Sequence, residues 1–527
     1  MFQKTSYHEA IETAITSNNN NLLVKAGPGS GKTTTGANVI VPSLVRKNGP
    51  NGGAIVFNKR NQTDMAAKLS RFPDVEVSTV HALCLRLIKF KWEKMRVNAA
   101  QKEGYQGFGK YRRYCPAKLG KLRDTIESLY PDFKEPEKAQ IEKIANLMKG
   151  HALGISGHPD ANLDSVRELC DLYGINNNKP EGEIEPLDDS LLDAAIEIFG
   201  VTVNDKSSVD FGDMLYFVLK YNLAMPQWSW VFVDEAQDMS PSMIEFLARM
   251  SKAGIRVVAV GDPNQGINFF AGALNDSMDR MEEKFNADVL PLPVSYRCSR
   301  VAAEMANGIF ANSIIPSDTA KPGICENISF EEFVNSEFPD DSLIMARSHK
   351  LIFPSAIAYV KAGKKFRYKG IREITVKMEK SLRMAFMRSG KSGDLTAMRQ
   401  SLLDHQEQKN DNNNSGKVPR WLQELNEVID CLCDLLIAVE KDGGNYDDVI
   451  NYLSKLADAE DSTYGPLFSS IHAAKGAESP NVYIVGPMES PLAKTEGELA
   501  AEKCAAYVAL TRASDKLTLV SAPGLTN

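Results

Sequence analysis

Residues 22–34 read LLVKAGPGSGKTT, and this stretch decides the fold. A short apolar run comes first, a glycine-rich turn follows, and a helix is predicted to begin near Lys32. Successive backbone N–H groups in such a turn can surround phosphate oxygens, and the start of the helix adds a favourable dipole. The segment therefore predicts a phosphate-binding loop between a strand and a helix.

The residue types of this loop suit a nucleoside triphosphate. Lys32 is expected to reach the β- and γ-phosphates of ATP, and the Thr33 hydroxyl is expected to hold Mg²⁺. The other predicted nucleotide-binding residues of the loop are Gly27, Gly29, Ser30, Gly31 and Thr34. The strict pattern begins with glycine, whereas this chain has Ala26 there. An ordinary glycine-rich turn is the alternative, and the flanking strand and helix favour phosphate binding.

Paired carboxylates follow a second apolar run, residues 230–233. Asp234 is expected to bind Mg²⁺, and Glu235 is expected to polarise the attacking water. Gln237 is a further predicted nucleotide contact. A solvated strand end is the alternative, and the upstream phosphate loop favours the catalytic interpretation.

A third run, residues 257–260, ends at Gly261 and Asp262. Gln265 follows and could sense the γ-phosphate. An ordinary turn explains the same residues equally well.

Apolar runs between polar helical stretches predict parallel α/β sheets, in which ligands bind at the carboxyl ends of the strands. Similar runs occur at residues 54–57, 342–346, 482–485 and 517–520. Residues 91–205 and 372–462 are instead rich in helix formers. We predict a first α/β domain over 1–90 and 206–290 and a second over 291–371 and 463–527. Helical insertions are predicted at 91–205 and 372–462.

Composition sets limits on the function. The 527 residues are 43% hydrophobic and carry a net charge of −7, which excludes a mainly disordered chain and a uniformly basic nucleic-acid coat. The eight cysteines form no zinc-like or disulfide-like spacing. The chain starts without an apolar signal core, and no run reaches the roughly 18 apolar residues of a membrane span. We expect a cytoplasmic protein with no membrane partner.

Further motifs appear in a fixed order. They read STVHAL at 78–83, DFGDML at 210–215, LPVSYR at 292–297, SIHAAKGAE at 470–478 and AYVALTRA at 506–513. Together with the phosphate loop and the Asp-Glu strand, they resemble the UvrD/Rep type of superfamily 1 DNA helicases over residues 21–519. The resemblance implies two RecA-like motor domains and a requirement for ATP and Mg²⁺.

The resemblance also implies roles for individual residues. The implied catalytic residues are Lys32, Glu235, Gln265, Arg297 and Arg512, with the two arginines at the γ-phosphate. Tyr296 and Glu478 are implied nucleotide contacts. The implied nucleic-acid contacts are Phe57, Asn58, His81, Phe270 and His472.

The chain departs from the family pattern at several positions. Phe270 stands where the family commonly has Trp, Asn268 where it has Tyr, and Ala271 where it has Arg. Stacking is kept at Phe270, but one basic contact is lost. The glutamine that reads adenine in the family aligns with Tyr7 or His8, which leaves adenine selectivity open.

Residues 86–123 hold twelve Lys or Arg against two acids, with aromatic residues between them. This composition is typical of a solvated helical face and also of a single-strand contact. Because the segment follows the His81 motif directly, we expect the 91–205 insertion to contact nucleic acid.

The predicted function is an ATP-dependent translocase or helicase on single-stranded or tailed duplex DNA, with 3′-to-5′ polarity implied by the resemblance. One alternative is an ATP-gated nucleic-acid clamp or sensing subunit in a complex with a protein partner such as a nuclease. Another is a phosphate-loop ATPase that acts on protein partners.

Overall fold

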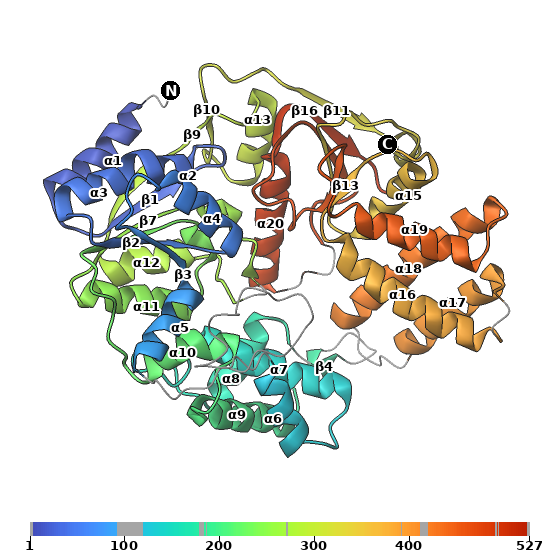
Figure 1. Cartoon of the computed structure of the whole chain (residues 1–527), viewed down its shortest axis with the longest axis horizontal. Helices are drawn as coiled ribbons and strands as arrows, with labels where there is room; N and C mark the ends of the chain where they lie inside the picture. The colour runs from blue at the N-terminus through green and yellow to red at the C-terminus, as the bar shows by residue number, and fades with distance from the viewer. Residues whose placement is uncertain are drawn as a thin grey trace. The chain divides into compact units, whose positions relative to one another are not determined.

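The computed structural model describes residues 4–91, 120–175, 177–178, 184–185, 187–269, 272–390, 393–411, 420–490, 493 and 495–523 (Figure 1). The chain forms two compact units. Unit 1 comprises residues 1–177, 186–293 and 494–501, and unit 2 comprises residues 178–185, 294–493 and 502–527.

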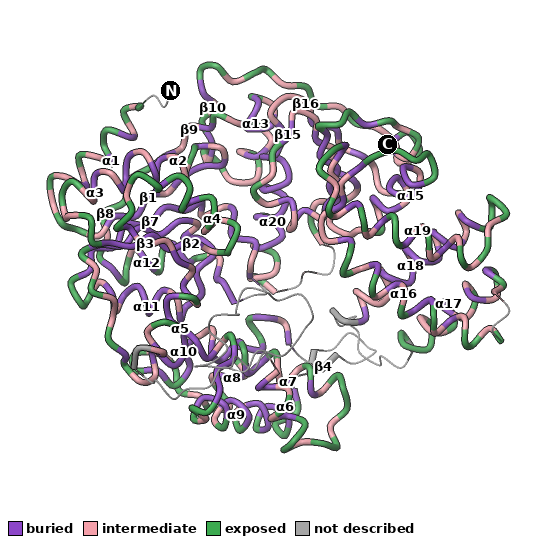
Figure 2. Tube along the Cα trace, viewed as in Figure 1, coloured by how far each residue is buried: buried purple, intermediate pink, exposed green. Residues whose placement is uncertain are grey.

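Unit 1 is built on a six-stranded parallel sheet with strand order β3-β2-β6-β7-β1-β8. Its strands are β1 (Leu22–Ala26), β2 (Gly52–Val56), β3 (Glu76–Thr79), β6 (Trp230–Val233), β7 (Arg256–Gly261) and β8 (Asp288–Leu292). All residues of β2, β6 and β7 are buried, as the continuous apolar runs predict for central parallel strands (Figure 2). Because β1, β6 and β7 run parallel, their following loops lie at one edge of the sheet.

The helices of unit 1 follow in chain order. They are α1 (Ser6–Ser17), α2 (Lys32–Thr35), α3 (Val41–Asn48), α4 (Lys59–Lys68), α5 (Val80–Lys91), α6 (Lys121–Leu129), α7 (Glu135–Gly150), α8 (Leu163–Leu172), α9 (Asp189–Asn204), α10 (Phe211–Lys220), α11 (Pro241–Lys252) and α12 (Ser277–Phe285). Helices α6 to α9 lie within the predicted helical insertion and share one hydrophobic core with α5, α10 and α11. This insertion is therefore packed onto the first sheet domain through a continuous apolar interior.

Unit 2 contains a second six-stranded parallel sheet, with strand order β11-β16-β15-β12-β14-β13. Its strands are β11 (Ile324–Ile328), β12 (Ser342–Ala346), β13 (Arg367–Tyr368), β14 (Leu467–Ser470), β15 (Ser479–Val485) and β16 (Ala513–Val520). The two parallel sheets confirm the predicted fold class.

Most helices of unit 2 flank its strands, and four of them, α16 to α19, follow β13 directly. The helices are α13 (Arg300–Ile309), α14 (Phe330–Val334), α15 (Phe353–Lys361), α16 (Ile371–Arg388), α17 (Leu395–Asp411), α18 (Arg420–Lys441), α19 (Tyr446–Asp458) and α20 (Glu496–Leu510). Helices α16 to α19 form a bundle whose buried residues join the core around β12 and α15 (Figure 1). The first residues of α20 belong to unit 1 and the rest to unit 2. In the described ranges, no helix combines the length and apolarity needed to cross a membrane.

Candidate active site

The predicted phosphate loop connects β1 to α2 and has the backbone geometry of an anion cradle. Gly29 and Gly31 have φ of 69° and 78°, which residues with a side chain rarely adopt. The Ser30 hydroxyl donates to the Gly27 carbonyl at 2.8 Å, and the Gly27 N–H donates to the Leu292 carbonyl at 2.9 Å. These bonds tie Gly27 to Ser30 within the turn and to the end of β8, immediately before the helix that starts at Lys32.

The helix after the loop packs closely onto the sheet. The chain runs from α2 through a π-helical turn, Gly36–Ile40, into α3, whose first turn contains Pro42. A Cβ on Gly36 would come within 2.4 Å of the Phe232 ring on β6. Glycine at 36 therefore lets this helix approach the strand that ends in Asp234.

Thr33 and Asp234 meet at the sheet edge. The Thr33 hydroxyl donates to Asp234 Oδ2 at 3.0 Å, and Asp234 is 2% exposed. Burial, reinforced by the negative charge of Glu235, raises the pKa of Asp234 to about 7. The two residues predicted to hold Mg²⁺ are thus in contact, in a place where a carboxylate needs a neighbouring cation.

Glu235 adopts a left-handed backbone conformation, with φ of 55° and ψ of 46°. This conformation costs a residue with a side chain about 1 kcal/mol or more, and such strain is concentrated at functional sites. The Asp234 side chain accepts the Glu235 N–H at 3.0 Å and so supports the turn.

Gln237 links the end of β6 to the end of β7. Its amide nitrogen donates to Glu235 at 2.5 Å, and its amide oxygen accepts the Asp262 N–H at 2.9 Å. A Cβ on Gly261 would lie 2.6 Å from this oxygen, so glycine leaves room for the amide. Gln265 is buried in the short 3₁₀ turn that follows, Pro263–Gln265.

Lys32, at the start of α2, is partly buried, and its positive charge lowers the pKa of Asp234, which opposes the effect of burial.

Three other predicted residues are brought together in unit 2. Arg297 Nε donates to Glu478 at 2.5 Å, and its side chain is 21% exposed. Arg512 is 1% exposed, and its guanidinium donates to the carbonyls of Val508 at 2.8 Å and Ala477 at 3.2 Å. Arg512 therefore holds the segment that carries Glu478 against the end of α20.

Tyr296 and His472 differ in exposure. Tyr296 is 56% exposed and precedes Arg297, as expected for a side chain that could cover a nucleobase. His472 is partly buried in the loop after β14.

The predicted nucleic-acid contacts of unit 1 that the structure describes follow β2 and β3: Phe57 and Asn58 lie between β2 and α4, and His81 lies in the first turn of α5. Phe57 is partly buried, and the exposed Asn58 caps α4 by accepting the Asn61 N–H at 2.9 Å. The His81 ring stacks on Phe211, with a centroid distance of 3.8 Å and an interplanar angle of 21°. Burial lowers the pKa of His81 to about 4, so the imidazole is neutral at pH 7. Phe270 and most of the basic stretch, residues 92–119, lie outside the described residues.

His8, one of two candidates for contacting adenine, is instead part of the fold. It is 3% exposed; Nδ1 accepts the Thr5 N–H at 3.1 Å, and Nε2 lies 3.1 Å from the Thr35 hydroxyl. Burial lowers its pKa, with a smaller effect from the charge of Lys4. His8 therefore ties α1 to the helix of the phosphate loop, and Tyr7 is the partly exposed candidate that remains.

Comparison with known proteins identifies the family of the chain. The UvrD/REP helicase N-terminal domain matches residues 7–286, which is just over half of the chain. The chain belongs to the UvrD/Rep helicase family.

Curated relatives of this helicase family are similar at low identity. A probable DNA helicase II homolog from Mycoplasma pneumoniae is 21% identical over 58% of this chain and 42% of its own length. DNA helicase IV from Escherichia coli is 23% identical over 61% of this chain and 49% of its own length. ATP-dependent DNA helicase PcrA from Bacillus subtilis is 22% identical over 57% of this chain and 39% of its own length. The matches therefore span less than half of each relative.

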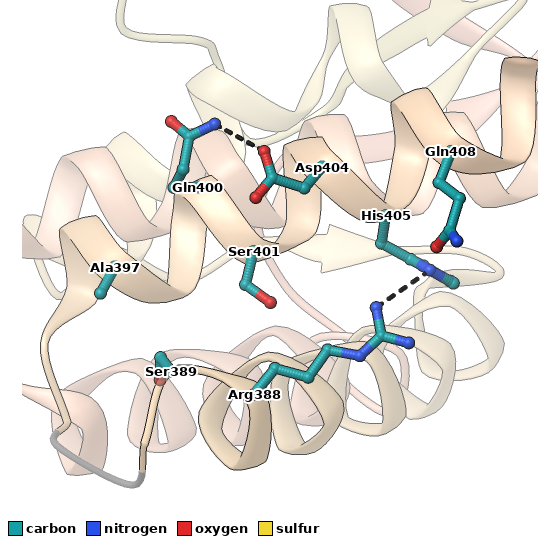
Figure 3. Close-up of a pocket in the computed structure, with 8 residues that line it drawn as sticks. All are labelled: Arg388, Ser389, Ala397, Gln400, Ser401, Asp404, His405 and Gln408. Carbon is teal, nitrogen blue, oxygen red and sulfur yellow. Dashed lines mark hydrogen bonds between the residues drawn. The ribbon is translucent and has the colours of Figure 1, made fainter.

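Two features of this helicase-family chain were not anticipated from its sequence. Phe211, 58% exposed at the first residue of α10, presents an aromatic face beside His81. Its position within the DFGDML motif was the available signal. The second is a cavity of about 590 Å³ between α16 and α17 (Figure 3). Arg388 and His405 face each other there, 3.3 Å apart, and no predicted site residue lines the cavity.

Proposed function

We propose that this chain is an ATP-dependent motor that moves along single-stranded DNA and separates tailed duplexes. The contact between Thr33 and Asp234 carries the proposal, because it joins a phosphate loop to the acidic end of a parallel strand. Glu235 and Gln237 extend the contact to the end of β7. This arrangement suits phosphoryl transfer to water, which depends on positioning and charge stabilisation.

Mg²⁺ fits the residues at this position. Thr33 and Asp234 offer a hydroxyl and a carboxylate oxygen 3.0 Å apart, the ligand types that Mg²⁺ prefers. The raised pKa of Asp234 reflects a buried carboxyl with a second carboxylate beside it, and a bound cation would relieve that cost. When bound, Mg²⁺ would neutralise charge on the phosphate oxygens.

The chain's own residues would divide the work of hydrolysis. The phosphate-loop N–H groups and Lys32 hold the β- and γ-phosphates. Glu235 accepts a proton from the attacking water, and Gln237 orients its carboxylate. We propose that Gln265 senses the γ-phosphate and that Arg297 and Arg512 supply positive charge to it. Tyr296 would cover the base.

The DNA contacts we propose are Phe57, Asn58, His81, Phe270 and His472, together with Phe211. Single-strand binding combines aromatic faces for the bases with basic groups for the phosphates. The exposed Phe211 ring stacked on His81 is the described feature that best suits a base. The basic stretch at 86–123 would supply phosphate contacts.

The relatives support this assignment, since each is named as a DNA helicase or a probable one. The test measures ATP hydrolysis without nucleic acid and with single-stranded DNA, duplex DNA or RNA. We expect the largest stimulation by single-stranded DNA. Equal rates in all four conditions would refute a nucleic-acid motor and would favour an ATPase that acts on protein partners.

A second function is favoured by the sequence at 268–271. Asn268 and Ala271 lack the aromatic and basic groups that the family places there, so one basic contact to the strand is lost and stacking rests on Phe270. An ATP-gated binding or sensing subunit of a nuclease complex needs hydrolysis and DNA binding but no processive unwinding. DNA-stimulated ATPase without strand displacement on a tailed duplex of either polarity would select this alternative.

A further inference from the structure

Two lysines and two aspartates are buried together in unit 1. Lys149 on α7 lies 2.7 Å from Asp210 and 2.7 Å from Asp213, and Lys121 on α6 lies 2.9 Å from Asp213. Asp213 is fully buried, and each of the other three residues is at most 5% exposed. Even a closely paired cluster of buried charges adds little stability compared with apolar packing, so stability alone does not explain this one.

The pairing within the cluster is nearly complete. Lys121 also donates to the backbone carbonyls of Thr202, Asp205 and Ser208 at 2.8 to 2.9 Å. Burial acts to lower the pKa of Lys149, but the charges of Asp213 and Asp210 outweigh it, so the pKa is raised. Lys149 is therefore a cation at neutral pH, held between the carboxyl groups of Asp210 and Asp213.

The cluster fixes the first turn of α10. Asp210 is the N-cap residue and accepts the Asp213 N–H at 2.7 Å, while Asp213 accepts the Asp210 N–H at 3.1 Å. Gly212 lies directly against the lysine, because a Cβ there would come within 2.9 Å of Lys149 Cδ. In the sequence, Phe211 lies between Asp210 and Gly212, two residues of this buried turn. Its own side chain, however, is 58% exposed and stacks on His81.

We propose that Lys149 and Lys121 are positioning residues that hold the Phe211–His81 pair in place for stacking on a DNA base. The inference rests on the proposed function. Both lysines belong to the helical insertion, whereas both aspartates belong to the helix that leads towards β6. The insertion would thus set the geometry of a DNA contact through buried charges without touching the base itself.

A double-mutant cycle tests the proposal by fluorescence anisotropy with a labelled oligothymidylate. Phe211→Ala is expected to lower single-strand affinity about tenfold, the effect of losing one stacked base. Lys149→Met is expected to lower it severalfold in the wild-type background and by less than about twofold in the Phe211→Ala background. Coupled effects of this kind identify residues that act through one another.

The chain provides a matched control on the same helix. Lys138 is also a buried lysine of α7, but it donates to the Pro131 carbonyl at 3.0 Å instead of to the aspartates. Lys138→Met is expected to lower the melting temperature and leave DNA affinity unchanged. If Lys149→Met does not fold, Gly212→Ala tests the same contact without changing any charge, and a two- to fivefold loss of affinity is expected.

The outcomes separate the inference from the proposed function. If the wild-type protein does not bind the oligonucleotide, the proposed function fails. If it binds, three results overturn the inference alone. These are no effect of Phe211→Ala, equal effects of Lys149→Met in both backgrounds, or full affinity in a folded Lys149→Met or Gly212→Ala protein.

Discussion

The Thr33 hydroxyl lies 3.0 Å from Asp234 Oδ2, although β7 separates the two strands that carry these residues to the sheet edge. Such a contact requires the loop after β1 and the end of β6 to face the same point. Gly36 makes this possible by letting the helix after the loop approach Phe232 on β6. The predicted chemistry of unit 1 depends on this convergence.

Removing the carboxylate of Glu235, which we propose activates the attacking water, should stop turnover. Glu235→Gln keeps the side-chain size and should lower ATP turnover by about 100-fold or more, because no base remains to accept the proton. Lys32→Ala should have a similar effect through lost phosphate binding. Steady-state phosphate release measures both, with the exposed Glu283→Gln as a control. Wild-type rates in either variant would overturn the site assignment.

The two arginines of unit 2 should respond differently to truncation. Arg297→Ala should lower kcat about 100-fold or more through lost charge at the phosphate and change the melting temperature little. Arg512→Ala should also lower the melting temperature, because the guanidinium no longer donates to the Val508 and Ala477 carbonyls, at about 1–3 kcal/mol for each lost bond. Calorimetry and ATPase assays on both variants test this. Equal melting temperatures would contradict the structural part of Arg512's role.

Phe270 is predicted to stack on a DNA base. Phe270→Ala should weaken single-strand binding about tenfold and reduce the stimulation of ATPase by DNA. Anisotropy titration and DNA-dependent ATPase assays measure the two effects. Unchanged binding together with unchanged stimulation would remove Phe270 from this role.

The close approach at Gly36 predicts that an added side chain there lowers the stability of the fold, and Gly200 on α9 serves as the control. Gly36→Ala should lower the free energy of unfolding by about 1–3 kcal/mol, because its Cβ would overlap the Phe232 ring. Gly200→Ala, on α9 with no atom within 4 Å of its added Cβ, should raise it by up to about 1 kcal/mol. Chemical denaturation measures both. A stable Gly36→Ala protein would show that the helix can shift away from β6.

His151 predicts how stability depends on pH. Burial, with smaller effects from Arg280 and His158, lowers the pKa of His151 to about 4. The unfolded chain binds this proton below about pH 6.5, and the folded chain binds it only near pH 4, so acid favours unfolding. The free energy of unfolding should fall by up to about 3 kcal/mol across that window.

The control for this pH effect is His151→Gln, which removes the titrating group. The His151 Nε2 lies 2.8 Å from the Tyr173 hydroxyl, a contact that a glutamine carbonyl could still make. The melting temperature of the wild-type protein should therefore fall more between pH 7 and pH 5 than that of the variant. Equal slopes would show that other groups dominate the acid response.

The sequence predicted the central strands better than the outer ones. Strands β6, β7, β12 and β16 coincide with predicted apolar runs. Inner strands of a parallel sheet are covered on both faces, so their side chains are apolar on both sides. Strands β3 and β8 form the edges of the first sheet, and β11 and β13 form those of the second. Residues of β8 and β11 are largely exposed, so these strands lack the continuous apolar run that marks the others.

The site showed a similar division. The residues predicted to bind phosphate and Mg²⁺ occur in contiguous motifs directly after apolar runs. The meeting of Thr33 and Asp234 at one edge of the sheet could therefore be anticipated from the parallel α/β pattern. The pairing of Arg297 with Glu478 and the burial of Lys149 beside Asp213 join segments distant in sequence. No local pattern marks such pairs, since a lone lysine or glutamate on a helix is usually solvated.

Strand displacement tests the central claim most directly. The assay uses duplex DNA with a 3′ single-stranded tail, a matched 5′-tailed duplex, ATP, and the Lys32→Ala protein as the inactive reference. We predict ATP-dependent release of the displaced strand from the 3′-tailed substrate and little release from the 5′-tailed one. Release from neither substrate, by a protein whose ATPase is stimulated by single-stranded DNA, would contradict the motor.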